Sequence, residues 1–532
     1  MHDLLIRGGR VLDGTGARAI EADVAIDGDR IAAIAPGLSG AAKRTLDARG
    51  QVVAPGLIDI HTHSDYTLPI NPRAESKIRQ GITTEVVGNC GFSIAPALPG
   101  KVGALEDYLR ASAFWLSFKE TTFAEYLDTY PATSVNMVPQ VGHNTLRLMT
   151  VGMERRKATE AEIAEMGRLL EEGLAAGALG LSSGLFTAPG SNAGPEEILA
   201  LARIVAKHGG RYSTHLRDEG NGVFDAVREA IDVARQTGVH VQIAHLKLSG
   251  IENWGKARKL LAEIEAARKA GILVDCDQYP YDTGSNPLRN LLPAWVQEGG
   301  VPKMVERLRD PAVRRRMRDE IARDGLNNFG KIPSWDAVRI AISKNNPQHA
   351  GRRMAELARE LGREPFDQVC ETLIADEGHT RILITSMAEE DVQAITGTPW
   401  VLVGSDGTCL AAEGVTSAGL PHPRFYGSHA RMLGCCVRDL KLLTLEQAVH
   451  KMTGGSAAAL GWTDRGWLKP GMAADIAIFD PATVADTATY ERPHQYATGV
   501  SSVVVNGTVV IDGGGHNGAL PGRVLRRPRS AH

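Results

Sequence analysis

Short apolar runs alternate with helical patterns through the middle of the chain, and this alternation is the main structural signal in the sequence. The helical patterns carry end signals, because Thr159 and Glu162 fit a capping box and Pro195 stands at a helix start with Gly209 beyond its end. Eight apolar runs have the length of buried parallel strands, namely residues 52–60, 83–87, 134–140, 178–182, 211–214, 240–244, 272–276 and 400–403. The pattern predicts an α/β fold in which residues 56–464 form a (β/α)8 TIM-like barrel.

The two ends of the chain have a different pattern, with short apolar strands separated by turns. Residues 4–53 hold several such strands. The C-terminal part repeats this pattern in three further runs, 475–479, 503–505 and 509–511. Asn506-Gly507 between the last two runs is a strong hairpin signal. Because isolated hairpins are only marginally stable, we expect residues 1–55 and 465–532 to form one small β-sandwich domain together.

One interval breaks the regular spacing of the barrel. Residues 282–399 separate the seventh predicted strand from the eighth, which is far longer than an ordinary loop between β/α units. We therefore expect an inserted subdomain at this point, forming a lid or a wall of the pocket.

Composition and charge exclude several classes of protein. The 59 Lys and Arg residues nearly balance the 62 Asp and Glu residues, so a nucleic-acid partner or an acidic membrane surface is not expected. No apolar run approaches the roughly 18 residues of a membrane span, and the N-terminus lacks the layout of a signal peptide. Six cysteines in 532 residues do not form the pattern of a disulfide framework. These features together predict a cytoplasmic enzyme.

The C-terminal ends of the predicted strands carry side chains that can bind a metal ion, and the chemistry of such barrels lies at these ends. His61 and His63 follow the first strand at a spacing that points both side chains the same way. The second, fifth, sixth and eighth strands are followed by Cys90, His215, His245 and Asp406. Each of these groups is a competent zinc ligand, the cysteine as a thiolate. Any one alone could be an ordinary core or turn residue, but six at one barrel mouth predict a metal site.

The chain resembles the amidohydrolase superfamily and, within it, the N-acyl-D-amino-acid deacylase (D-aminoacylase) family. The resemblance covers nearly the whole chain and is specific at the family level. It is carried by GLIDIHTH at 56–63, QGITT at 80–84, GNCG at 88–91, THLRDE at 214–219, AHLK at 244–247, YPY at 279–281, GSDG at 404–407, HPR at 422–424, KMTG at 451–454 and ADI at 474–476.

This resemblance implies zinc-dependent hydrolysis of the amide bond of N-acyl-D-amino acids, giving a carboxylate and a free D-amino acid. A tightly held zinc ion would be bound by Cys90, His215 and His245. His61 and His63 would frame a second, weaker zinc site, with Cys90 between the two sites. The D stereochemistry rests on the resemblance alone, and the preferred side chain and acyl group stay open.

Roles in catalysis and in substrate binding follow from the same resemblance. Asp406 would act as the general base toward the attacking water and then as the general acid toward the departing amine. The free carboxylate of the substrate would be bound by Arg424, Lys247, Tyr279 and Ser285. Arg424 offers a bidentate fork, whereas Lys247 offers a point charge. The expected partner is a small-molecule N-acyl amino acid or a related amide, and a homo-oligomer is compatible with the sequence.

Three further features near the strand ends have plainer explanations. We expect Asp65 to cap a turn, with the orientation of a metal ligand as the alternative. His143 follows the third strand and should face the barrel mouth, where an unliganded imidazole is expected and contact with substrate is the alternative. Residues 217–219 form a charged cluster that predicts a local salt-bridge network, which could also brace His215.

Two other functions are open at this point. A cyclic amidase of the hydantoinase or dihydropyrimidinase kind shares the barrel and the two early histidines, but typically uses a modified lysine from the fourth strand. That strand and its end, residues 178–185, contain no lysine, and Cys90 supplies the anion instead. A non-catalytic oligomeric scaffold would be expected to have lost metal ligands, whereas all the proposed ligands are present here.

Overall fold

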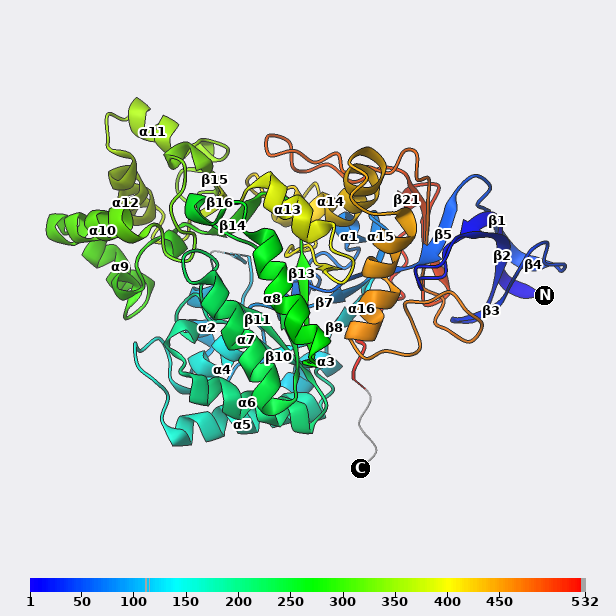
Figure 1. Ribbon diagram of the computed structural model, residues 1–532, viewed down its shortest axis with the longest axis horizontal. Coiled ribbons are helices and arrows are strands. Elements are labelled where there is room, and N and C mark those ends of the chain that lie inside the picture. Colours follow the sequence, from blue (N-terminus) through cyan, green and yellow to red (C-terminus); the bar gives the residue numbers. More distant parts are fainter. Residues whose placement is uncertain (111, 114, 528–532) are drawn as a thin grey trace.

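Parallel strands close into a barrel at the centre of the molecule, as the alternating pattern predicts (Figure 1). The structure, a computed structural model, describes residues 1–110, 112–113 and 115–527. The barrel strands are β6 (Leu57–Asp59), β7 (Ile82–Val86), β8 (Asn136–Val138), β9 (Val141–Gly142), β10 (Gly180–Gly184), β11 (Arg211–His215), β12 (His240–Ile243), β13 (Val274–Gln278) and β17 (Leu402–Val403). A parallel bridge between Thr62 and Gly407 joins the first of these units to the last.

The third predicted strand is divided in two. β8 pairs with β7, whereas β9 pairs with β10. Pro139 lies between the two halves, and because proline has no N–H to donate, it interrupts the ladder at this point. At this position of the barrel, β8 therefore pairs only with the preceding strand and β9 only with the following one.

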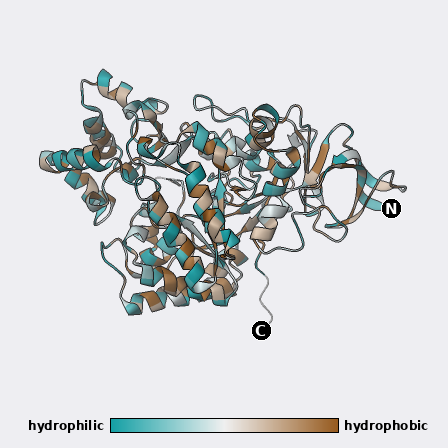
Figure 2. Ribbon diagram, viewed as in Figure 1, coloured by the Kyte–Doolittle hydropathy of each residue, from teal (hydrophilic) through white to brown (hydrophobic). Residues whose placement is uncertain are grey.

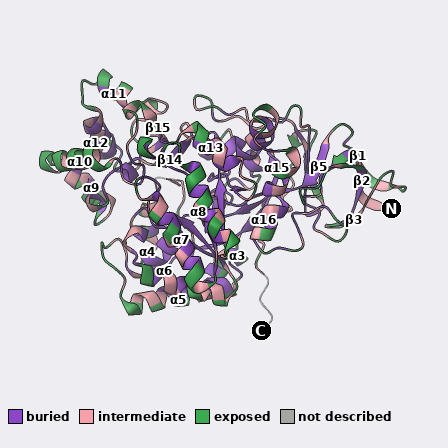
Figure 3. Cartoon of the chain, in the orientation of Figure 1, coloured by how far each residue is buried: buried purple, intermediate pink, exposed green. Residues whose placement is uncertain are grey.

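Helices cover the outside of the barrel and turn apolar stripes toward it. In α6 the buried residues Ile198, Leu201, Ala202 and Val205 recur at helical spacing, and Figures 2 and 3 show exposed polar positions on the outer faces of such helices. The predicted capping box of Thr159 and Glu162 is present at α5. The covering helices are α1 (Glu75–Ile78), α2 (Val102–Leu109), α3 (Phe123–Asp128), α4 (His143–Thr150), α5 (Glu160–Ala175), α6 (Pro195–Lys207), α7 (Val223–Thr237), α8 (Ala257–Lys269), α13 (Glu389–Thr396), α14 (Arg424–Arg431), α15 (Leu445–Met452) and α16 (Gly454–Ala459).

Both ends of the chain contribute to one nine-stranded sheet. Its strands are β1 (His2–Val11), β2 (Ile20–Asp27), β3 (Arg30–Ala35), β4 (Ala42–Asp47), β5 (Val52–Pro55), β18 (Ile476–Phe479), β19 (Val500–Val505), β20 (Thr508–Asp512) and β21 (Gly515–His516). The antiparallel pairing of β5 with β18 joins the two ends, and the Asn506-Gly507 turn closes the predicted hairpin with both residues at positive φ. Beyond this sheet the chain returns to the barrel, where Val524 bridges Met137.

The segment between β13 and β17 forms a separate layer with its own core (Figure 1). Its strands β14 (Thr283–Pro287), β16 (Arg381–Thr385) and β15 (Val338–Ile342) pair in that order in an antiparallel sheet. Four helices belong to the same layer, α9 (Val301–Leu308), α10 (Pro311–Asp324), α11 (Met354–Glu360) and α12 (Pro365–Ala375). The predicted domain boundaries stay predictions. Within the described residues, no helix has the length and apolar composition needed to cross a bilayer.

A fully buried lysine ties the start of the barrel to its last strand. Lys77 Nζ donates to Asp59 Oδ2 at 2.9 Å and to Ser405 Oγ at 2.6 Å, while the Ser405 N–H donates to Asp59 Oδ1 at 2.8 Å. Removing one partner of a buried ion pair leaves the other charge uncompensated. This network fixes the backbone immediately before Asp406.

We expect Lys77→Met to lower the free energy of unfolding by about 3–5 kcal/mol, because Asp59 would remain buried without its cation. Chemical denaturation of both proteins measures the difference. Lys269→Met removes an exposed lysine paired with Glu265 and serves as the matched control, with an expected change within about 0.5 kcal/mol. Equal effects of the two substitutions would show that the buried network does not stabilise the fold.

Candidate metal and catalytic centre

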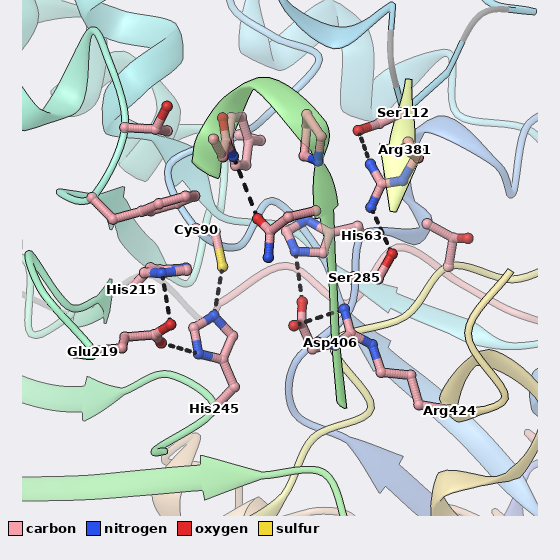
Figure 4. Close-up of a pocket in the computed structure, with 18 of the residues that line it drawn as sticks. His63, Cys90, Ser112, His215, Glu219, His245, Ser285, Arg381, Asp406 and Arg424 are labelled. Atoms are coloured by element: carbon pink, nitrogen blue, oxygen red, sulfur yellow. Dashed lines mark hydrogen bonds and ion pairs between the residues drawn. The ribbon is translucent and has the colours of Figure 1, made fainter. Parts of the chain in front are cut away.

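The structure brings all six predicted ligand side chains together at the C-terminal ends of the barrel strands. Figure 4 labels all of them except His61. Cys90 lies at the centre, with its Sγ atom 3.3 Å from His61 Nε2 and 3.3 Å from His245 Nε2. Two overlapping groups have all their ligand atoms within 4.8 Å of one another. They are Cys90, His215 and His245, and His61, His63, Cys90 and Asp406. Cys90 is thus the only side chain that both groups share.

Three of these residues have backbone conformations that residues other than glycine rarely adopt. Cys90, His245 and Asp406 have φ values of 52°, 33° and 47°. Such left-handed conformations cost free energy in residues other than glycine and collect at functional sites. The surrounding barrel therefore holds these three side chains in place against a local conformational preference.

Electrostatics favour the thiolate form of Cys90. Its burial alone would raise the pKa of the thiol, but the positive charges of His61 and His245 outweigh burial and hold that pKa well below its usual value. A thiolate is the form of cysteine that binds metals. The site therefore has its anionic ligand ready at neutral pH.

Two buried carboxylates position the histidines. The sequence offered the bracing of His215 as an alternative role for the cluster that contains Glu219, but it did not assign Asp277 any such role. Glu219 Oε1 lies 3.1 Å from His245 Nδ1, and Glu219 Oε2 lies 3.4 Å from His215 Nε2. Asp277 on β13 lies 3.3 Å from His61 Nδ1 and accepts from the backbone N–H of His245 at 3.0 Å. A carboxylate in a buried strand is a signal that could have found Asp277, because buried charges are rarely left without a role.

The charged cluster at 217–219 forms salt bridges with neighbouring residues outside the cluster, and Glu219 also contacts His215, as the alternative prediction states. Arg217 pairs with Glu229 at 2.8 Å, and Asp218 accepts from the N–H of Gly220. Only Glu219 turns inward, where it also pairs with Lys247 at 2.7 Å. The three neighbours separate because each points from the strand end in a different direction.

Asp406 lies between the histidines and an arginine. Its Oδ1 atom is 3.1 Å from His63 Nε2, and its Oδ2 atom is 2.9 Å from a terminal nitrogen of Arg424. Burial would raise the pKa of this carboxyl, but Arg424 and His245 hold it well below its usual value. Asp406 is therefore ionised and faces the metal-binding group.

The four predicted substrate-binding residues all line the cavity above this centre, namely Lys247, Tyr279, Ser285 and Arg424. Arg424 is buried, and its guanidinium carbon lies 4.4 Å from the centre of the Tyr279 ring. Two of its nitrogens, Nε and Nη1, have no hydrogen-bond partner among the described residues. Because buried donors are rarely left unsatisfied, these nitrogens indicate a place for an anionic ligand.

Neither His143 nor Asp65 is among the residues that line this cavity. His143 begins α4, and its Nε2 atom lies 2.7 Å from Glu197, so the side chain does not face the barrel mouth as predicted. Asp65 lies in a short 3-10 turn, Ser64–Tyr66, where burial raises the pKa of its carboxyl to about 7. Asp65 thus lies inside a turn, but no side-chain hydrogen bond caps this turn among the described residues, so the capping role stays a prediction.

Glu85 on β7 gives the fold a pH dependence of known sign. Lys77 is the shared cation of Asp59 and Glu85, with Nζ 2.9 Å from the first carboxylate and 3.8 Å from the second. Burial raises the pKa of Glu85 from its usual 4.5 to about 7. The folded protein therefore holds more protons than the unfolded chain between these pH values, and stability is lost as pH rises through about 7.

We expect Glu85→Gln to reduce this loss, since the amide stays neutral at every pH. The measurement is the fall in melting temperature between about pH 5.5 and about pH 8, which should be smaller in the variant than in the parent. Glu172→Gln on the exposed face of α5 is the control. An unchanged fall in the Glu85 variant would contradict the raised pKa.

Comparisons with known proteins agree with this geometry. Residues 44–511 match the family model described as Amidohydrolase family. D-aminoacylase of Alcaligenes xylosoxydans xylosoxydans is 39% identical over 99% of this chain and 98% of that protein. An N-acyl-D-glutamate deacylase structure from Bordetella bronchiseptica, complexed with zinc and a phosphonate mimic of the tetrahedral intermediate, is 34% identical with a TM-score of 0.82 and covers 99% of each chain. L-hydantoinase from Arthrobacter aurescens is 16% identical with a TM-score of 0.57 over 99% of this chain and 100% of its own, a likeness of fold alone.

Proposed function

Because this chain belongs to the amidohydrolase family, we propose that it hydrolyses the amide bond of N-acyl-D-amino acids, releasing a carboxylate and a free D-amino acid. One observation carries the proposal. The Cys90, His215 and His245 group opens with Asp406 onto a cavity that also contains Arg424 and Lys247. Hydrolysis of a linear N-acyl amino acid requires metal ligands and an ionised carboxylate for the reaction, and cations that bind the free carboxylate of the substrate.

The donor set fits zinc. One thiolate and two imidazoles are ligands that zinc accepts in a tetrahedral site with one position open, and the buried cluster of Cys90, His215 and His245 supplies them. His61 and His63 would hold a second ion, with Cys90 shared between the two sites. Bound zinc would polarise the scissile carbonyl and lower the pKa of a water molecule.

Asp406 performs the proton transfers in this proposal. The ionised carboxylate takes a proton from the attacking water and gives it to the amide nitrogen as the amine departs. Its contact with Arg424 at 2.9 Å weakens it as a base. A substrate carboxylate that binds Arg424 would compete for this contact, and the pKa of Asp406 would then rise toward its usual range.

A linear amide is favoured over a cyclic one by the ligand set. Cys90 occupies the position between the two ligand groups, and β10 with the residues that follow it offers no lysine. The similarity to the hydantoinase is one of fold. The substrate's free carboxylate would be bound by Arg424, Lys247, Tyr279 and Ser285.

Hydrolysis of a panel of N-acetyl D- and L-amino acids tests the proposal. The expected result is turnover of D members, with the L members hydrolysed far more slowly or not at all. A cyclic hydantoin belongs in the same panel as the test of the alternative function. Absence of turnover on every D member, or preference for the hydantoin, would overturn the proposal.

The cellular setting is a further part of the proposal. All six cysteines are free thiols in the structure, which suits a reducing compartment, and we propose that the enzyme acts in the cytoplasm. Assembly into a homo-oligomer stays a prediction from the sequence, which sedimentation of the purified protein would test.

A further inference from the structure

The cavity above the metal-binding group carries more positive than negative charge. Its acidic lining residues are Glu219 and Asp406, and each already has a basic partner. Glu219 pairs with Lys247 at 2.7 Å, and Asp406 pairs with Arg424 at 2.9 Å. Two further lining residues, Arg289 and Arg381, add positive charge without a matching carboxylate. No carboxylate among the residues that line the cavity therefore compensates the positive charges of these two arginines.

Neither extra arginine forms an ion pair within the part of the chain that the structure describes. Arg289 is buried and donates to the backbone carbonyls of Gly378 and Tyr108 at 3.2 and 3.3 Å. Arg381 donates to the hydroxyls of Ser112 at 2.5 Å and of Ser285 at 3.2 Å (Figure 4). A guanidinium has five N–H donors, so the two serine contacts leave donors of Arg381 free for an anion.

Arg381 also has a different origin from the residues assigned to the substrate's own carboxylate. Lys247 and Arg424 follow barrel strands β12 and β17, whereas Arg381 begins β16 in the layer inserted between β13 and β17. Ser285 lies on the neighbouring strand β14, and its hydroxyl accepts from Arg381. The serine thus connects the predicted carboxylate-binding group with a second cation on the cavity wall.

We infer that Arg381 binds a second carboxylate, carried by the substrate's side chain, so that the preferred substrates are N-acyl derivatives of acidic D-amino acids. The inference rests on the proposed function and adds the side-chain class to it. Arg381 is partly buried at the cavity wall and has no carboxylate partner among the described residues, and an arginine fork matches a carboxylate in two parallel hydrogen bonds. A dianionic substrate would supply one carboxylate to Arg424 and Lys247 and the other to Arg381.

The test compares acidic with neutral substrates in the zinc-loaded enzyme. N-acetyl-D-aspartate, N-acetyl-D-glutamate and N-acetyl-D-methionine are assayed with the parent and with Arg381→Met. In the parent, kcat/KM should be higher for an acidic member than for the methionine derivative. Loss of a hydrogen-bonded charge pair corresponds to about 10- to 100-fold, and this loss should appear in Arg381→Met for the acidic members only. The methionine derivative should be hydrolysed at least as well as by the parent.

Two further variants separate a specific effect from a general one. Arg381→Lys keeps the charge but not the fork, and we expect an intermediate loss on the acidic members. Arg318→Met removes an exposed arginine from α10, where it pairs with Asp367, and should leave every rate unchanged. Zinc content and melting temperature of each variant confirm that the fold and the metal site are intact.

Each remaining outcome decides against the inference. If the parent prefers N-acetyl-D-methionine, the side-chain assignment is wrong while the deacylase function stands. If Arg381→Met loses the same factor on all three substrates, Arg381 serves the carboxylate that they share. If no D-amino-acid derivative is hydrolysed, the proposed function fails and the side-chain class fails with it.

Discussion

Asp406→Asn is expected to abolish hydrolysis of N-acyl-D-amino acids while zinc stays bound. The substitution keeps the shape of the side chain but removes the group that accepts and returns the proton, a contribution of about 10²- to 10⁴-fold in general acid–base catalysis. Steady-state rates together with zinc content by elemental analysis measure both parts of the prediction. Retention of zinc is expected because Cys90, His215 and His245 form a complete group without Asp406.

The control for this variant is Asp439→Asn, which changes an exposed carboxylate paired with Arg438. It should leave both rate and zinc content unchanged. Because Asp406 also pairs with the buried Arg424, the melting temperature of the Asp406 variant must be compared with that of the parent. A folded, zinc-loaded Asp406→Asn protein with the parent's rate would remove Asp406 from the catalytic role.

Cys90→Ala has the second large expected effect, which is loss of the metal. Cys90 is shared by both groups of ligand atoms, and it supplies the anionic ligand of the tightly held ion. Outer-shell partners of metal ligands typically contribute about 10–100-fold in affinity, so deletion of a ligand itself should cost at least that factor. Zinc affinity measured by competition with a chelator gives the change, and turnover should fall with it.

Cys435→Ala is the matched control, because Cys435 is half-buried in a helical segment that follows α14 and belongs to neither group of ligand atoms. Its zinc affinity should equal that of the parent. Each variant loses one thiol and nothing else, so a difference in zinc affinity between them shows that the position of the thiol matters. Full activity and unchanged zinc content in Cys90→Ala would show that the ligand set is wrong.

The sequence predicted most of the barrel, and the six side chains that it proposed as ligands do lie together in the structure, for a physical reason. Strand ends are local features, and parallel strands in a barrel place all these ends at one mouth. His61, Cys90 and Asp406 are distant in sequence but adjacent in space because each follows such a strand. The division of the third strand at Pro139 is a smaller departure, since the proline itself marks the point.

The residues that sequence reasoning missed depend on tertiary packing. Arg381 lies in the inserted layer, and nothing local indicates that β16 would place its guanidinium beside Ser285 and Ser112. The inward turn of Glu219 likewise follows from the loop after β11, not from its charged neighbours. His143 shows the converse, because a strand-end position suggested the cavity while a buried carboxylate at Glu197 holds the ring elsewhere.

The central claim is that zinc held by Cys90, His215 and His245 enables hydrolysis of N-acyl-D-amino acids. The most direct test is titration of zinc into the metal-free protein while the turnover of an N-acetyl-D-amino acid and of its L enantiomer is followed. The account predicts no turnover without metal, a rise that is complete near about one zinc per chain, and selectivity for the D enantiomer throughout. Full turnover by the metal-free protein, or equal turnover of both enantiomers, would contradict it.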